Sequence, residues 1–169
     1  MFNTTIATQI YAKICFEATN SQKKIIENLS EYLSDDDFSR IFVLNGFAGT
    51  GKTTLIAAVV AALKELRIKP VLLAPTGRAA KVLARYCGEQ ALTIHKRIYR
   101  QRTNADYESK FSLDFNREQG AVFIVDEASM LSDSTGDGAL FGSGSLLEDL
   151  VSYVRSGRGC RLILVGDSA

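Results

Sequence analysis

The stretch Gly46–Thr53, which reads GFAGTGKT, decides how the rest of this 169-residue sequence is interpreted. A glycine stands at each end of a six-residue segment, and a lysine and a hydroxyl residue follow the second one. Glycines allow backbone conformations in which several N–H groups converge on phosphate oxygens, and a following helix adds its positive N-terminal dipole. The stretch therefore predicts a phosphate-binding loop between a strand and a helix, with an accidental glycine-rich turn as the alternative.

The side chains of this loop predict ATP and Mg²⁺ as cofactors. Lys52 supplies a cation for the β and γ phosphates, and the hydroxyl of Thr53 supplies an oxygen to Mg²⁺. Lys52 is therefore expected among the catalytic residues and Thr53 among the metal ligands. The residues of this segment expected to bind the nucleotide are Gly46, Ala48, Gly49, Thr50, Gly51, Lys52, Thr53 and Thr54.

A second acidic element follows the apolar run Val122–Val125, where Asp126 and Glu127 stand side by side. Ligands of parallel sheets bind at the carboxyl ends of the strands, so both carboxylates are expected at the nucleotide. Asp126 is expected to hold Mg²⁺, and Glu127 to orient and deprotonate the attacking water. A solvated Asp at the end of a strand is the alternative, but the upstream phosphate loop favours the catalytic interpretation. The pair also favours hydrolysis over phosphoryl transfer to a small acceptor.

Short apolar runs alternate with helical patterns along the chain, which is typical of a parallel sheet covered by helices on both faces. The predicted fold class is therefore α/β. Two stretches break the alternation, 101–120 and 132–145, and long loops are expected there, although the alternating Phe111, Leu113 and Phe115 also fit a hairpin strand. The expected strands are 41–44, 71–74, 121–125 and 161–165, and the expected helices are 21–33, 53–66, 78–86 and 146–154.

Composition indicates one domain, because 169 residues with 46% hydrophobic side chains can form one core but are too few for two domains of ordinary size. The net charge of +1 conceals a basic segment, 52–102, which holds eleven Lys or Arg residues and only two Glu. Such an excess is expected either on a surface that faces a polyanion or on solvated helix faces.

The cysteine content and the hydropathy of the sequence indicate in which cellular compartment the protein is expected. The three cysteines have no metal-like spacing and form no even set, which indicates a reducing compartment. No apolar run is long enough to span a membrane. A cytoplasmic protein without a membrane partner is expected.

Five segments together resemble the ordered motifs of superfamily 1 DNA helicases of the RecD-like branch. They are GFAGTGKTT at 46–54, APTGRAAK at 74–81, TIH at 93–95, VDEASM at 125–130 and LILVGD at 162–167. The resemblance is to the N-terminal RecA-like domain of the exodeoxyribonuclease V alpha-subunit type. It implies a RecA-like sheet and a single P-loop NTPase domain over 1–169, with a leading helix at about 19–34.

The resemblance also implies further site residues. Gln22 stands where a glutamine reads the adenine edge, although a glutamine that opens a helix can also be polar surface. Asp167 belongs to the motif that senses the γ-phosphate. Single-stranded DNA is the implied partner, with the contacts Pro75, Thr76, Arg78, Thr93 and His95. The start of the helix after Thr76 supports a phosphate contact independently, through its free N–H groups, whereas a structural or surface role is the alternative for His95.

The family builds its motor from two RecA-like domains, with arginines of the second stabilising the transition state. The sequence stops one residue before the glutamine that completes the last motif, so a second domain is expected to be absent from this chain. A truncated, monomeric ATPase domain with feeble hydrolysis on its own is expected. The function expected is that of the ATP-hydrolysing domain of a DNA helicase or translocase. A nucleotide kinase or signalling ATPase, or a nucleotide-binding module without turnover, remains the alternative.

Overall fold

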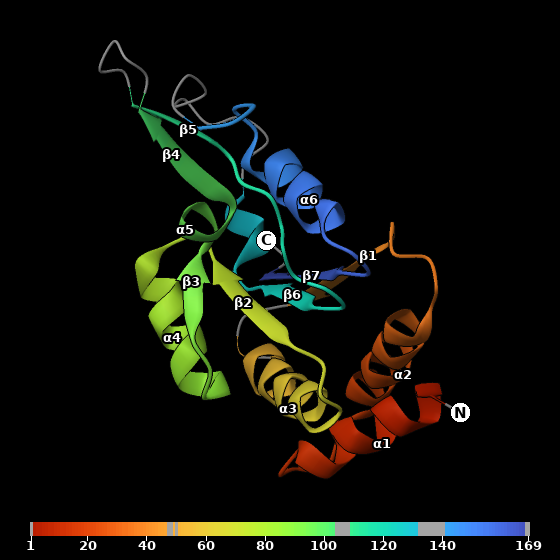
Figure 1. Cartoon of the computed structure of the whole chain (residues 1–169). Helices are drawn as coiled ribbons and strands as arrows, with labels where there is room; N and C mark the ends of the chain where they lie inside the picture. The colour runs from red at the N-terminus through yellow and green to blue at the C-terminus, as the bar shows by residue number, and fades with distance from the viewer. Residues whose placement is uncertain (1, 47–48, 50, 104–108, 132–140, 168–169) are drawn as a thin grey trace.

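A five-stranded parallel sheet forms the centre of the chain in a computed structural model, which describes residues 2–46, 49, 51–103, 109–131 and 141–167 (Figure 1). The strand order is β1-β7-β6-β2-β3, and each neighbouring pair is parallel. The strands are β1 (Ile41–Gly46), β2 (Pro70–Ala74), β3 (Ala91–Thr93), β6 (Val122–Val125) and β7 (Arg161–Asp167).

Helices cover both faces of this sheet, which confirms the predicted α/β class. The helices α1 (Phe2–Lys13), α2 (Asn20–Ser34), α3 (Lys52–Glu65) and α4 (Gly77–Cys87) pack on one face. On the other face lie the short α5 (Ile94–Ile98) and α6 (Leu146–Ser156). The central strand β6 is buried along its whole length, as its uninterrupted apolar sequence requires.

The register brings the carboxyl ends of the strands to one edge. Gly46 of β1 pairs with Asp167 of β7, and Ala74 of β2 pairs with Thr93 of β3. Val125, the last residue of β6, pairs with residues of both β2 and β7. All the predicted motifs that follow strands therefore meet at this edge.

The first predicted helix, 21–33, is observed as α2 and begins with a capping box at Thr19. Its hydroxyl accepts a hydrogen bond from the backbone N–H of Gln22 at 3.2 Å, and the Gln22 side chain accepts one from the N–H of Thr19 at 2.9 Å. The helix ends at Ser34, and its C-cap residue, Asp35, opens the acidic run expected to terminate it.

The prediction of a loop over 101–120 is wrong for part of that segment. Strands β4 (Tyr99–Thr103) and β5 (Ser109–Leu113) form an antiparallel hairpin, as the alternating Phe111 and Leu113 had allowed. One face of the hairpin is apolar and packs against the α6 side of the core, which stabilises strands that carry polar residues on their other face. Helices α1 and α5 and strand β3 were not predicted.

The second predicted loop, 132–145, falls largely outside the described residues, because 132–140 are not among them. Its last five residues form turns that lead into α6. None of the helices in the described part of the chain has the length and apolarity that a membrane crossing requires.

Candidate functional site

A hollow of about 520 Å³ lies at the carboxyl edge of the sheet, where the phosphate-loop segment, the acidic pair and the end of β7 meet. Most of the described residues predicted to bind nucleotide, metal or water line it. Its lining consists of Gly49, Gly51, Lys52, Thr53, Asp126, Glu127, Ser129, Met130, Gly166 and Asp167. Ala48 and Thr50, also predicted to bind the nucleotide, lie outside the described residues.

Lys52 is the first residue of α3 and turns its side chain into this hollow. Its Nζ donates to the carbonyl oxygen of Gly46 at 2.9 Å and lies 2.7 Å from Oδ1 of Asp167. The side chain is only 12% exposed, so the ammonium is held largely away from bulk water. Lys52 is thus tied to both β1 and β7 at the place where phosphate oxygens are expected.

The backbone before Lys52 explains two of the glycines. Gly49 and Gly51 have φ angles of 79° and 83°, in the left-handed region that side chains with a Cβ rarely adopt. Gly51 then precedes the N-terminus of α3, whose first N–H groups have no intrahelical partner. These features suit a loop that directs N–H groups toward an anion.

Asp126 is anchored to the sheet and to its own neighbour. Its N–H donates to the carbonyl oxygen of Leu73 at 3.0 Å, and its Oδ1 accepts from the N–H of Glu127 at 2.9 Å. Burial raises the pKa of the Asp126 carboxyl, and the charge of Asp167 raises it further. The hydrogen bond from Glu127 and the charge of Lys52 act in the opposite direction. The site therefore gathers more negative charge than Lys52 offsets.

Glu127 has a φ angle of 53°, which is unusual for a residue other than glycine. Such backbone conformations cluster at functional sites, because the surrounding structure must maintain them. The short helix η1 (Ala128–Met130) begins directly after Glu127. The turn exposes Glu127 at the hollow while Asp126 stays partly buried.

Three lining residues, Ser129, Met130 and Gly166, were not predicted as site residues. Ser129 and Gly166 touch closely, because a Cβ added to Gly166 would lie 3.1 Å from the backbone nitrogen of Ser129. This approach packs η1 against β7 and holds the acidic turn beside Asp167. The available signal was that all three residues fall within the segments 125–130 and 162–167.

Gln22 lies at a second, smaller hollow of about 280 Å³ on the other side of the phosphate-loop segment. A Cβ added to Gly51 would lie 3.3 Å from Nε2 of Gln22, so the amide and the loop are adjacent. Apolar groups dominate the lining, as a planar base requires. The lining residues are Thr19, Ser21, Gln22, Ile25, Leu44, Asn45, Gly46, Gly51, Lys52 and Leu55.

The residues predicted to contact DNA fall on the same edge of the sheet, past β2 and β3. Thr76 caps α4 and accepts from the N–H of Ala79, and Thr93 caps α5 and accepts from the N–H of Lys96, both at 3.2 Å. The side chains of Thr76 and Arg78 are exposed, and Pro75 is half-buried. The structure therefore brings these two predicted segments together.

His95 follows Thr93 but faces an aromatic cluster. Its ring lies edge-on to Phe141, with centroids 4.9 Å apart, and 5.6 Å from the ring of Tyr99. The side chain is half-buried. These contacts agree with the structural alternative for His95, and its predicted contact with DNA stays a prediction.

The donor set fits the predicted Mg²⁺ ion. Among the described residues there is no group of three or more His, Cys, Asp or Glu side chains that could enclose a metal. Mg²⁺ in nucleotide sites is usually held by one or two carboxylates together with phosphate oxygens and water. Thr53 and Asp126, which line the same hollow, provide such a partial set. Burial, and to a lesser extent the charge of Asp167, raises the pKa of Asp126, and a bound cation would favour its ionised form.

Comparison with known proteins gives one family and several relatives. The sequence profile of a family described as "AAA domain" matches residues 17–169. The chain is 29% identical to the ATP-dependent RecD2 DNA helicase of Deinococcus radiodurans over 148 residues, covering 88% of this chain and 18% of that protein. It is 34% identical to the RecBCD enzyme subunit RecD of Mycobacterium tuberculosis over 152 residues, covering 76% of this chain and 23% of that protein.

A third relative is the ATP-dependent DNA helicase dda of Enterobacteria phage T4. It is 37% identical over 92 residues, covering 52% of this chain and 20% of that protein. These similarities confirm the resemblance to RecD-like helicases that the motifs indicated. The chain spans about a fifth of the length of these relatives.

Proposed function

Because this chain belongs to the AAA domain family, we propose that it binds ATP with Mg²⁺ and hydrolyses it as the motor domain of a DNA helicase or translocase. The observation that carries the proposal is the convergence of Lys52, Asp126, Glu127 and Asp167 around one hollow at the carboxyl edge of the sheet. The names of the relatives, each an ATP-dependent DNA helicase or a RecBCD subunit, support it.

The residues of the hollow divide the chemistry among them. Lys52 would exchange its contacts with Gly46 and Asp167 for phosphate oxygens, and so stabilise the charge that develops on the transferred phosphoryl group. Glu127, exposed at the hollow, would orient a water molecule and accept its proton. Thr53 and Asp126 would hold Mg²⁺, which neutralises phosphate charge when it is bound.

The remaining predicted contacts extend the proposal. Gln22 would read the edge of the adenine from the smaller hollow, with its Nε2 as donor. Single-stranded DNA would lie along Thr76, Arg78 and Thr93, where the exposed side chains of Thr76 and Arg78 and the helix N-termini suit phosphate contacts. The spacing of three free cysteines supports a cytoplasmic location.

A second RecA-like domain is part of the proposal. Among the described lining residues of the 520 Å³ hollow, Lys52 is the sole cation. An arginine supplied from elsewhere accelerates phosphoryl transfer by about 10³–10⁵ in comparable sites. We therefore expect slow turnover by residues 1–169 alone, and a monomeric two-domain motor as the active form.

The test measures ATP binding by residues 1–169 and ATP turnover by the complete gene product that contains them. Saturation at about 100 times the dissociation constant adds about 2.7 kcal/mol to stability, which corresponds to a rise of roughly 5–11 °C in the melting temperature of a domain this size. Lys52→Ala is expected to abolish that rise. Lys64→Ala is the matched control, because Lys64 lies on the same helix but pairs with Glu89 away from the hollow.

Turnover separates the proposed motor from its alternatives. The motor is expected to hydrolyse ATP faster when oligo(dT) is added, and Lys52→Ala is expected to remove both rates. Hydrolysis that ignores DNA, or transfer of phosphate to a small acceptor, would point instead to a signalling ATPase or a nucleotide kinase. Binding without hydrolysis in the complete gene product would leave a nucleotide-binding module.

A further inference from the structure

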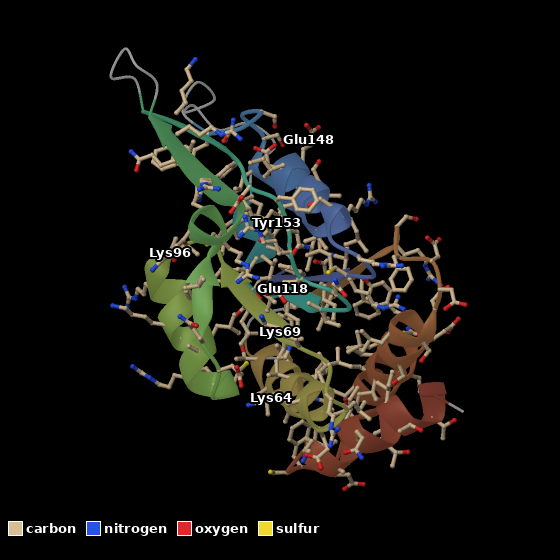
Figure 2. The ribbon with its side chains drawn as sticks, in the orientation of Figure 1. Lys64, Lys69, Lys96, Glu118, Glu148 and Tyr153 are labelled. Atoms are coloured by element: carbon tan, nitrogen blue, oxygen red, sulfur yellow. The ribbon has the colours of Figure 1, made fainter. Side chains whose placement is uncertain are left out.

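Helix α4 has an outer face on which two apolar and two basic side chains are exposed. Val82 and Tyr86 are 44% and 60% exposed, and they are among the described large hydrophobic side chains that the core leaves uncovered. Lys81 and Arg85 are exposed beside them. Figure 2 shows side chains of α4 that project into open space on the side away from α3. This face of the helix is therefore accessible to a partner.

The spacing of these four residues arranges them in two rows. Lys81 and Arg85 are four residues apart, as are Val82 and Tyr86, and residues at that separation are neighbours on the surface of a helix. The opposite side of α4 carries the residues that are buried in the core. A basic row and an apolar row therefore run side by side along the exposed side of the helix. Adjoining exposed apolar side chains are more informative than isolated ones, which are common on protein surfaces.

The two cations have no acidic partner in the described part of the chain. Neither Lys81 nor Arg85 forms an ion pair there, and α4 contains no Asp or Glu. The acidic residue nearest in sequence, Glu89, pairs with Lys64 in the last turn of α3 (Figure 2). Like charges four residues apart on a helix repel each other, so an anion placed against this row would stabilise α4.

The position and the chemistry of the face favour a peptide over nucleic acid. A helix rises about 1.5 Å per residue, so Tyr86 lies about 12 Å along α4 from Arg78, where a DNA contact is proposed. Val82 has no π-face on which a base could stack, but it can pack against another apolar side chain. Tyrosine and arginine are enriched among the residues that contribute most to protein–protein binding. The face thus combines an apolar anchor with a charge that an acidic segment complements.

We propose that this face of α4 is a docking site for an acidic segment of a partner protein that carries a large apolar side chain. The carboxylates of the segment pair with Lys81 and Arg85, and its apolar side chain packs on Val82 and Tyr86. None of the four residues lines either nucleotide hollow, and none is among the predicted DNA contacts. The site therefore goes beyond the proposed ATP-dependent function and does not depend on it.

The experiment begins with the selection of binders from a displayed library of random short peptides, with residues 1–169 as the bait. The selected sequences are expected to combine Asp or Glu with Phe, Leu or Ile, because such sequences satisfy both rows. A labelled synthetic peptide of the most enriched sequence then serves as the probe for affinity measurements. Selected sequences without an excess of acidic residues would contradict the proposal.

The basic row is tested by reversal of its charge. Lys81→Glu/Arg85→Glu is expected to weaken binding of the probe at least about ten-fold at low salt, and by less as added salt screens the charges. Lys23→Glu/Lys24→Glu is the matched control, because it makes the same change in net charge at two exposed lysines of α2. The control is expected to bind the probe like the wild type. An equal loss in both variants would reduce the effect to net charge and overturn the assignment to α4.

The apolar row is tested without a change of charge. Val82→Ser/Tyr86→Ser is expected to weaken binding of the probe on the order of ten-fold at every salt concentration, because packing is lost. Both positions are exposed, so the melting temperature and the ATP affinity are expected to stay close to those of the wild type. If the double variant melts lower, Tyr86→Ser alone is compared with Tyr86→Phe, which keeps the ring and is expected to retain binding. Wild-type affinity for the probe in the serine variants would sink the docking site.

Other occupants of the face are recognised with the same variants. If oligo(dT) displaces the probe and Val82→Ser/Tyr86→Ser weakens both equally, the face binds nucleic acid and the proposal is wrong. If residues 1–169 form a dimer that this variant dissociates, a second copy occupies the face and the proposal is again wrong. A library that yields no enriched sequence would also overturn it. Each of these outcomes leaves the proposed ATP site unaffected, because α4 lines neither nucleotide hollow.

Discussion

At Asp126, the negative charge that Mg²⁺ binding requires lowers the stability of the folded state. Burial and the neighbouring charge of Asp167 raise the pKa of its carboxyl, so the folded state binds a proton there more readily than the unfolded state. The protonated form therefore stabilises the fold at a pH below the ordinary Asp value. That contribution is lost as the pH rises through the raised pKa, and at neutral pH the ionised carboxylate is unfavourable.

Asp126→Asn is expected to raise the melting temperature at neutral pH. It is also expected to lower the rate of Mg²⁺-dependent ATP hydrolysis on the order of a hundred-fold or more. The gain in melting temperature is expected to shrink as the pH falls below the ordinary Asp value, because the wild-type carboxyl is then neutral in both states. Thermal melts at several pH values, with the exposed Asp36→Asn as control, check this. A lower melting temperature for Asp126→Asn at neutral pH would contradict it.

The linear motifs made several residues of the site predictable. Lys52, Asp126 and Glu127 stand beside glycines or at the end of an apolar strand, and the chemistry of those patterns depends on short-range spacing. Ser129 and Gly166 fall within the motif segments 125–130 and 162–167, but their place in the site depends on a contact between η1 and β7 that only tertiary packing creates.

At the scale of an element, the start of α2 combines a structural and a proposed functional role in one side chain. Oε1 of Gln22 accepts the hydrogen bond that completes the capping box, while Nε2 lies beside Gly51 at the smaller hollow. The oxygen of the amide therefore caps the helix, and its nitrogen is proposed to contact the base. A matched pair of substitutions separates these two roles.

Gln22→Glu keeps an acceptor for the capping box and removes the donor, so we expect an unchanged melting temperature and reduced discrimination of ATP from GTP. Thr19→Ala removes the cap and is expected to cost about 0.5–2 kcal/mol of stability while discrimination is retained. Thermal melts and competition binding with the two nucleotides measure both effects. If Gln22→Glu binds ATP and GTP in the wild-type ratio, Gln22 does not read the base.

The hairpin shows why some elements could not be predicted from local sequence. Phe111 and Leu113 alternate as a strand should, but the partner strand reads YRQRT and looks polar along its length. Tyr99 is the one aromatic residue of that strand and faces the core. Its ring packs against that of the distant Phe141, and its hydroxyl donates a hydrogen bond to Asp149 at 2.6 Å. Neither contact can be inferred from spacing along the chain.

At the scale of the whole molecule, α1 completes the core on the face that holds α2 and α3. Ile6 and Ile10 are both 0% exposed and belong to the same cluster as Leu29 and Val59. Two isoleucines one turn apart are too weak a pattern to predict a helix, since apart from Phe2 and Tyr11 the rest of the segment is small or polar. Strands β1, β2, β6 and β7 of the parallel sheet were predictable because they contain continuous apolar runs, whereas α1 depends on surfaces that α2 and α3 form together.

This dependence predicts the effect of Ile10→Ala. Removing a fully buried isoleucine side chain is expected to cost about 2–5 kcal/mol, because the neighbouring helices cannot close the cavity completely. For a chain of this size the melting temperature should fall by roughly 4–20 °C. Thr8→Ala is the matched control on the exposed side of α1, and we expect its effect to stay within about 0.5 kcal/mol. ATP affinity should persist in the folded fraction of Ile10→Ala, because α1 lines neither nucleotide hollow. Equal melting temperatures for Ile10→Ala and Thr8→Ala would mean that α1 is not packed on the core. The folded ATP-binding domain would then begin at α2.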